Sequence, residues 1–185
     1  MKSSVNIFWF RRDLRLHDNT ALFHALQSKL PVLPILIFDE NIIDELPEDD
    51  ARISFIYDTL WAIDNQLKNY YRSLKVFKGS PLSVFKRLLE DHDIKDLFCN
   101  KDYEPYAIKR DNEVRTFLGN NGIGFNTFKD HVVFEENEIT KDDGKPYTVF
   151  TPFAKKWKSI LTNNDLKTYN VCLLYTSDAA DDLVG

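Results

Sequence analysis

The stretch Ile7-Phe8-Trp9-Phe10-Arg11-Arg12-Asp13-Leu14-Arg15-Leu16-His17-Asp18-Asn19 decides the fold of this chain. It begins with four apolar or aromatic residues without alternation, which is typical of a strand buried on both faces. Four charges follow in five positions, and Asp18 or Asn19 can then cap a helix that begins near Thr20. Such a charged loop lies at the carboxyl edge of a parallel sheet, where ligands bind. A solvated loop whose charges pair with one another is the alternative that the spacing leaves open.

The composition is that of a single globular domain, alone or with a tail. The chain has 185 residues, of which 43% are hydrophobic, enough for a real core. Its formal charge of −5 gives no overall attraction to nucleic acid, so any contact with DNA requires a local basic patch. Its two cysteines have neither metal-site nor disulfide spacing, and no leader or membrane-spanning stretch is visible. A cytoplasmic protein is expected.

Strands and helices alternate along most of the chain. Apolar runs predict strands at 7–10, 32–38, 74–77, 94–99 and 124–128, and periodic apolar stripes and caps predict helices from about 20, over 51–71, from 81 and over 105–118. The alternation predicts an α/β fold with a doubly wound, five-stranded parallel sheet between helices, Rossmann-like in topology. Pro34 lacks a backbone donor, so an irregularity is expected in the second strand. No strand is followed by G-x-G-x-x-G, which disfavours an ordinary dinucleotide site.

The pattern changes after residue 131. Residues 132–134 and 147–150 read as two short extended pieces around a polar turn, and Thr151-Pro152 is expected to open a helix over 153–161.

Three motifs carry a resemblance to a known family. They are W-F-R-R-D-L-R-L-x-D-N at 9–19, N-x-D-x-E-P-Y at 100–106 and Y-x-V-F-T-P-F-x-K-x-W at 147–157. Together they resemble the DNA photolyase and cryptochrome family, from about residue 6 to about residue 161. The resemblance implies that residues 1–161 form the α/β antenna domain of that family and that residues 162–170 begin an interdomain linker.

The second motif implies an antenna-pigment site. In relatives that bind 8-hydroxy-5-deazaflavin the two acids of this motif contact the pigment, which here means Asp102 and Glu104. Arg11, at the end of the first strand, is expected to face them across the same cleft. Folate-binding relatives use an Asn-Glu pair where this chain has Tyr106 and Ala107, which argues against methenyltetrahydrofolate and leaves a plain flavin open. The alternative is that Asp102 or Glu104 only caps the helix that begins at Pro105.

A second candidate site is the basic cluster Lys155, Lys156 and Lys158. Lysines on an exposed helix neutralise DNA phosphates without reading sequence, a role that the resemblance favours. A solvated helix face is the alternative. The four histidines have no metal or triad spacing, and no catalytic residue is predicted.

The last segment, 171–185, differs in character from the rest. It resembles the translation of a sequencing adapter, and a disordered terminus is the alternative. A segment of that origin carries no information about the fold, and the reading frame is expected to have been cut short.

The resemblance implies a function for the parent protein. The chain is expected to be the N-terminal antenna-binding domain of a deoxyribodipyrimidine photolyase, a monomer whose partner is damaged DNA. FAD and the flipped pyrimidine dimer would bind in a helical domain that this sequence lacks, so the chain alone is expected to be inactive. The alternatives are a cryptochrome-type blue-light sensor and a stand-alone nucleotide-binding module.

Overall fold

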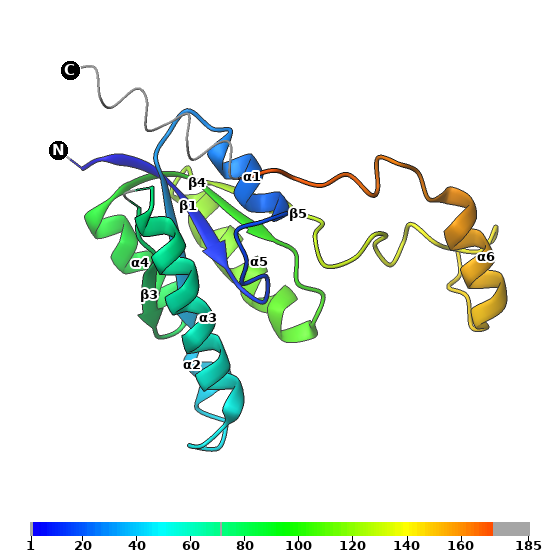
Figure 1. Ribbon diagram of the computed structural model, residues 1–185, viewed down its shortest axis with the longest axis horizontal. Helices are drawn as coiled ribbons and strands as arrows, with labels where there is room; N and C mark the ends of the chain where they lie inside the picture. Colours follow the sequence, from blue (N-terminus) through cyan, green and yellow to red (C-terminus); the bar gives the residue numbers. More distant parts are fainter. Residues whose placement is uncertain (1, 71, 172–185) are drawn as a thin grey trace.

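The computed structural model describes residues 2–70 and 72–171, and its sheet confirms the predicted fold. Five parallel strands stand in the order β3-β2-β1-β4-β5, with helices on both faces (Figure 1). In chain order the elements are β1 (Ser4–Phe10), α1 (Thr20–Leu26), β2 (Val32–Phe38), α2 (Glu40–Ile43), α3 (Ala51–Lys68), β3 (Lys75–Lys78), α4 (Pro81–Asp91), β4 (Asp93–Asn100), α5 (Pro105–Asn120), β5 (Gly124–Phe128) and α6 (Phe150–Ile160).

The sheet winds outward from its first strand in both directions. From β1 the chain adds β2 and β3 on one side and then crosses back to add β4 and β5 on the other. The loops that leave β1 and β4 therefore diverge at the switch point of the sheet, where a crevice opens at its carboxyl edge. None of the described helices is both long and apolar enough to cross a membrane.

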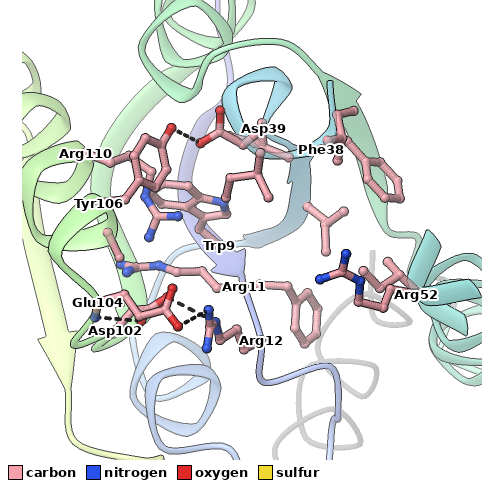
Figure 2. Close-up of a pocket in the computed structure, with 17 residues that line it drawn as sticks. Trp9, Arg11, Arg12, Phe38, Asp39, Arg52, Asp102, Glu104, Tyr106 and Arg110 are labelled. Atoms are coloured by element: carbon pink, nitrogen blue, oxygen red, sulfur yellow. Dashed lines mark hydrogen bonds and ion pairs between the residues drawn. The ribbon is translucent and has the colours of Figure 1, made fainter. Parts of the chain in front are cut away.

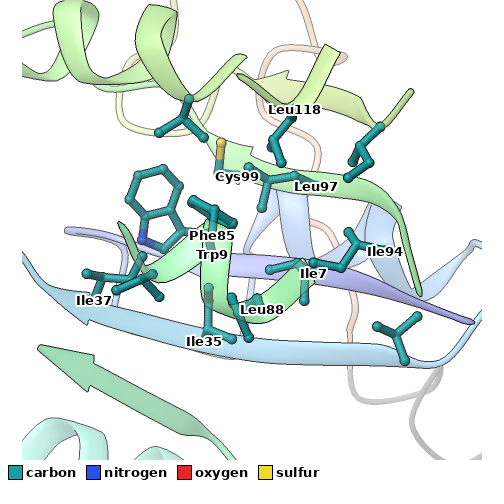
Figure 3. Close-up of a cluster of buried hydrophobic side chains, with 14 residues drawn as sticks. Ile7, Trp9, Ile35, Ile37, Phe85, Leu88, Ile94, Leu97, Cys99 and Leu118 are labelled. Atoms are coloured by element: carbon teal, nitrogen blue, oxygen red, sulfur yellow. The ribbon is translucent and has the colours of Figure 1, made fainter. Parts of the chain in front are cut away.

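Two apolar clusters explain why β1 is apolar without alternation. Ile7 and Trp9 face a cluster completed by α4 and α5, in which the Trp9 and Phe85 rings meet edge to face at 5.3 Å (Figure 3). Phe8 and Phe10 face the opposite cluster, completed by α1 and α3. Successive side chains of a strand point to opposite faces, so a central strand covered on both sides must be apolar throughout.

The expected irregularity at Pro34 is wrong. Strand β2 runs unbroken through Pro34, which pairs in register with Phe8 of β1. On its other side β2 pairs with β3 only from Ile35 onward. Pro34 thus lies where β2 has a single strand neighbour, so the missing donor interrupts no ladder. The register shift that does occur lies between β1 and β4, at Val5 to Ile7.

Two expectations for the segment after β5 are also wrong. Residues 132–134 and 147–149 form no strand, because the chain has left the sheet there and a short strand needs an edge to pair with. Helix α6 begins at Phe150 rather than at residue 153, and Pro152 is accommodated in its first turn. Helix α2 was not predicted.

Helix α6 stands apart from the sheet (Figure 1). It contains no buried residue, and Trp157 packs edge to face on Phe134 of the incoming segment at 5.4 Å. The chain then returns to α1, where the Tyr169 amide donates to Asp18 at 2.9 Å and Val171 is fully buried. Of the predicted tail, only Val171 is described, and 172–185 lie outside the described residues.

Candidate functional site

A buried polar network fixes the loop after β1 against the end of β4. The Asp13 carboxylate accepts hydrogen bonds from the Arg11 amide at 2.9 Å, from the Asn19 side chain at 3.0 Å and from the Asn100 side chain at 2.6 Å. Asn19 and Asn100 are joined to each other at 2.9 Å and cap α1 through the amides of Leu22 and Ala21. The side chains of Asp13, Asn19 and Asn100 are all buried. The motifs at 9–19 and 100–106 are thus joined by one rigid hydrogen-bond network.

The cavity beside this network is the site that the loops position. It measures about 320 Å³ and lies over the carboxyl ends of β1 and β2, bounded by α2, by the start of α3 and by the loop into α5. Its apolar wall comprises Trp9, Phe10, Leu36, Ile37, Phe38, Ile42, Ile43, Ile56 and Ala107. Its polar lining comprises Arg11, Arg12, Asp39, Arg52, Asp102, Glu104, Tyr106 and Arg110 (Figure 2).

All three predicted cofactor-binding residues line this cavity, but the ion pair across it differs from the prediction. Arg12, not Arg11, is directed toward the two acids (Figure 2). Its guanidinium lies 2.6 Å from a Glu104 oxygen and 3.5 Å from an Asp102 oxygen. The Asp102 side chain is only 9% exposed, whereas those of Arg12 and Glu104 are more than half exposed. The Arg12–Glu104 ion pair is therefore exposed to water at the rim of the cavity, whereas the Asp102 carboxylate is nearly buried.

The capping alternative describes only part of what these acids do. Glu104 occupies the N-cap position of α5, yet its side chain makes no capping hydrogen bond. One oxygen of Asp102 accepts from the Glu104 amide at 3.3 Å, which steadies the loop. The other oxygen faces Arg12. Asp102 is thus held in place by the backbone while presenting charge to the cavity.

Arg11 turns inward instead. Its guanidinium donates to Asp111 of α5 and to the Cys99 sulfur of β4, each at 2.6 Å. Burial alone would lower the pKa of Arg11, but the Cys99 and Asp111 interactions outweigh it and raise that pKa. Burial raises the pKa of the Cys99 thiol to about 11. Among the described residues the buried Nε of Arg11 has no hydrogen-bond partner.

The far end of the cavity is closed by a second polar contact. The Tyr106 hydroxyl donates to the buried Asp39 carboxylate at 2.6 Å, and Asp39 also caps α2 through the Asn41 amide. Burial, followed by this hydrogen bond to Asp39, raises the pKa of Tyr106 to about 12. Tyr106 is therefore a neutral hydroxyl at physiological pH. Arg110, one turn further along α5, donates to Asp111 and lies over the ring of Trp9.

The lining combines apolar walls with polar groups. The described lining holds no histidine, serine, cysteine or lysine. It offers flat apolar walls with carboxylate, guanidinium and hydroxyl groups at the ends, the mixture that fixes a planar heterocycle. Sequence reasoning missed Arg12, Asp39, Arg52 and Arg110 as lining residues. The positions of Arg12 beside Arg11, and of Asp39 directly after a strand, were the signals available for two of them.

The predicted basic cluster lies elsewhere. Lys155 and Lys158 are exposed on α6, Lys156 is half-buried, and α6 stands away from the cavity (Figure 1). The structure thus does not bring the two predicted sites together.

Comparisons with known proteins identify the family. A family model described as DNA photolyase matches residues 6–171. The chain belongs to the DNA photolyase family. Its match reaches ten residues beyond the end expected from the motifs, to the buried Val171. The chain is the N-terminal α/β domain of the family, and the resemblance in its three motifs is confirmed.

Relatives and solved structures agree with this assignment. The chain is 28% identical over 153 residues to the deoxyribodipyrimidine photo-lyase of Synechococcus sp. (strain ATCC 27144 / PCC 6301 / SAUG 1402/1), a match to 83% of this chain and 32% of that protein. It is 32% identical over 146 residues to Cryptochrome-1 of Drosophila melanogaster, covering 76% and 27% of the two chains. The crystal structure of an archaeal photolyase from Sulfolobus tokodaii with two FAD molecules superposes with a TM-score of 0.74 at 28% identity, covering 94% of this chain and 41% of that one. The chain thus spans about a third of the curated photo-lyase.

Proposed function

We propose that this domain binds the antenna pigment of a deoxyribodipyrimidine photo-lyase that repairs pyrimidine dimers in DNA with light. The observation that carries the proposal is the apolar cavity with Asp102 and Glu104 at its rim. The bound pigment would absorb light and pass the excitation to FAD in the remainder of a full-length protein. On this proposal the 185-residue chain alone repairs nothing, and the full-length protein acts as a cytoplasmic monomer.

The residues present fit a deazaflavin or flavin ring. Asp102 and Glu104 can accept from a ring NH or hydroxyl group, and Arg11 lines the same cavity with its guanidinium turned toward Asp111 and Cys99. Phe10 and Phe38 of the lining offer apolar contact to the ring faces. Arg12 already bridges both acids, so it would either move aside or become the partner of the same ring edge.

The order of preference among pigments follows from the same residues. 8-hydroxy-5-deazariboflavin comes first, because Asp102 and Glu104 stand where deazaflavin-binding relatives have their acids. A plain flavin comes second, supported by the second FAD of the Sulfolobus tokodaii photolyase. Methenyltetrahydrofolate comes last, because the Tyr106 hydroxyl is engaged by Asp39 and Ala107 is buried and apolar.

Equilibrium binding of the three pigments to the purified 185-residue chain tests the proposal. Asp102→Ala should weaken the binding of 8-hydroxy-5-deazariboflavin about ten- to a hundredfold, which corresponds to loss of one charge-assisted hydrogen bond of roughly 1.5–3 kcal/mol. Asp91→Ala, at an exposed site at the end of α4, is the matched control and should leave the affinity unchanged. Tightest binding of methenyltetrahydrofolate, or equal affinities in the two variants, would refute the assignment.

The 32% identity to Drosophila Cryptochrome-1 supports a cryptochrome as the alternative function. A blue-light sensor would use the same domain without repairing DNA. Light-dependent repair of a thymine-dimer oligonucleotide by the full-length protein separates the two functions. Absence of turnover with intact bound FAD would favour the sensor.

Binding of DNA phosphates by α6 is a separate part of the proposal. Changing Lys155, Lys156 and Lys158 to Gln in the full-length protein should weaken DNA binding equally across sequences. The slope of log K against log salt should become shallower by roughly 0.9 for each phosphate that is no longer neutralised. Lys86→Gln on the exposed face of α4 serves as the control. An unchanged slope would instead indicate that the three lysines form a solvated face of α6.

A further inference from the structure

Trp9 occupies an unusual electrostatic position in the wall of the cavity. The guanidinium carbon of Arg11 lies 4.7 Å from the centre of its indole ring, and that of Arg110 lies 4.9 Å away. Trp9 is 2% exposed, and the two arginine side chains are 4% and 10% exposed. Two buried cations therefore flank the one tryptophan of the described lining (Figure 2).

An indole in this place is a hazard to an antenna pigment, and this step of the argument rests on the proposed function above. Indole is the most easily oxidised of the ordinary side chains, and an excited flavin-type ring is a strong oxidant. Transfer of one electron from Trp9 to the excited pigment would leave an indole cation radical and a pigment reduced by that electron. No bond or proton need move, and return of the electron would dissipate the excitation as heat. A cavity that passes excitation onward must suppress this step.

We propose that Arg11 and Arg110 make Trp9 redox-silent and thereby protect the excited state of the pigment. The neutral indole is attracted to both guanidiniums through its ring face. The oxidised indole would carry a positive charge within 5 Å of two further positive charges, in a buried site where screening is weak. The same contacts that stabilise the ground state therefore oppose the loss of an electron.

The groups that are bonded to the two guanidiniums leave part of this positive field in place. Asp111 accepts from both guanidiniums, at 2.6 Å from Arg11 and 3.0 Å from Arg110, and holds them in place. Asp111 and the two guanidiniums together carry one net positive charge beside the indole. Cys99, the other partner of Arg11, adds no negative charge because burial keeps it a thiol at neutral pH, with a pKa of about 11.

Fluorescence lifetimes of bound pigments test the proposal. The full 185-residue chain is loaded with riboflavin or with 8-hydroxy-5-deazariboflavin, and only the lifetime of the bound fraction is compared. Arg110→Gln, which removes one charge, should shorten the lifetime severalfold and produce a transient indole radical absorption. Arg110→Lys, which keeps the charge, should not. The double variant Trp9→Phe/Arg110→Gln should regain the long lifetime, because the electron donor is gone. Arg110→Met replaces Arg110→Gln if the latter does not fold.

The outcomes separate this inference from the function on which it rests. Failure of both pigments to bind would overturn the antenna function and this inference together. Normal binding with an unchanged lifetime in the charge-removing variants would overturn the inference alone and leave the two arginines a packing role. A lifetime that stays short in the double variant but recovers with Tyr106→Phe would identify Tyr106, not Trp9, as the donor and would also overturn it.

Discussion

At the scale of single residues, Asp13 connects the two stretches of chain that carry the charged rim of the cavity. Its buried carboxylate serves three donors from two separate stretches of chain, the loop after β1 and the end of β4. That loop carries Arg12, and the segment after β4 carries the two acids that Arg12 meets. The geometry of the rim therefore depends on a residue that does not line the cavity.

Asp13→Ala should destabilise the fold strongly. The substitution leaves the buried Arg11 amide without its acceptor, at a cost of about 1–3 kcal/mol. It also removes one hydrogen bond each from the Asn19 and Asn100 side chains, which keep their bonds to the Arg15 carbonyl and to each other. Urea denaturation should show a midpoint far below that of the exposed-site control Asp91→Ala. Closely similar midpoints would mean that water replaces the missing carboxylate.

The sequence predicted the residues of the rim but not which arginine pairs with the acids. Strand alternation puts Arg11 on the same side as Trp9, toward α5, where Asp111 lies. Arg12 then projects over the sheet edge toward Asp102 and Glu104. Which helix covers which face is decided by crossovers that join distant parts of the chain, so adjacent arginines could not be told apart from spacing alone.

At the scale of elements, the return segment 161–171 is fastened to α1 by aromatic contacts. The His24 ring stacks on Phe128 of β5 at 4.4 Å, and Tyr169 packs on Phe23 at 5.1 Å. Burial, followed by the charge of Lys167, lowers the pKa of His24. His24, within these contacts, therefore binds a proton less readily in the folded chain than in the unfolded chain.

The stability of this fastening should depend on pH in a defined direction. Because the folded pKa is lowered, the unfolded chain binds the proton first as pH falls, so stability is lost on acidification from about pH 7 through the unfolded value near 6.5. His24→Gln should flatten that part of the pH profile of the thermal midpoint. His131→Gln, at an exposed position, is the control. Parallel profiles in native and His24→Gln proteins would contradict the expectation.

The elements of the sheet could be predicted from sequence and the segment after it could not. The strands that form the centre of the sheet are short, apolar and bounded by a cap or a turn, so local pattern and final environment agree. Residues 132–134 have the composition of a strand but no neighbouring edge. Helix α6 begins three residues early because its start is set by the chain path and not by a capping side chain.

At the scale of the whole molecule, the described chain leaves much apolar surface open to water. Phe150 on α6 is 79% exposed, and Phe55 and Trp61 on the outer side of α3 are 71% and 66% exposed. Exposed aromatic groups of this size mark surfaces that are covered by further protein or that drive association.

The purified chain should therefore bind a dye for apolar surface and scatter light increasingly with concentration. Phe150→Ser, far from the sheet, should reduce both signals without lowering the thermal midpoint, because its side chain supports no core packing. Phe85→Ser in the buried cluster should lower the midpoint sharply and serves as the contrasting variant. A monodisperse native chain that binds no dye would contradict this view.

The strand order also determines when each part of the sheet can form during synthesis on the ribosome. The central strand is the first of the five strands to be made, and its two neighbours are separated from each other in the chain by more than fifty residues. When β3 has emerged, the nascent chain can pair three strands and cover one face with α1 and α3. The other face, with Ile7, Trp9 and Ile35, waits for α4 and α5. Until then that face remains exposed and apolar, and the cavity cannot be complete before the residues that follow β4 have been translated.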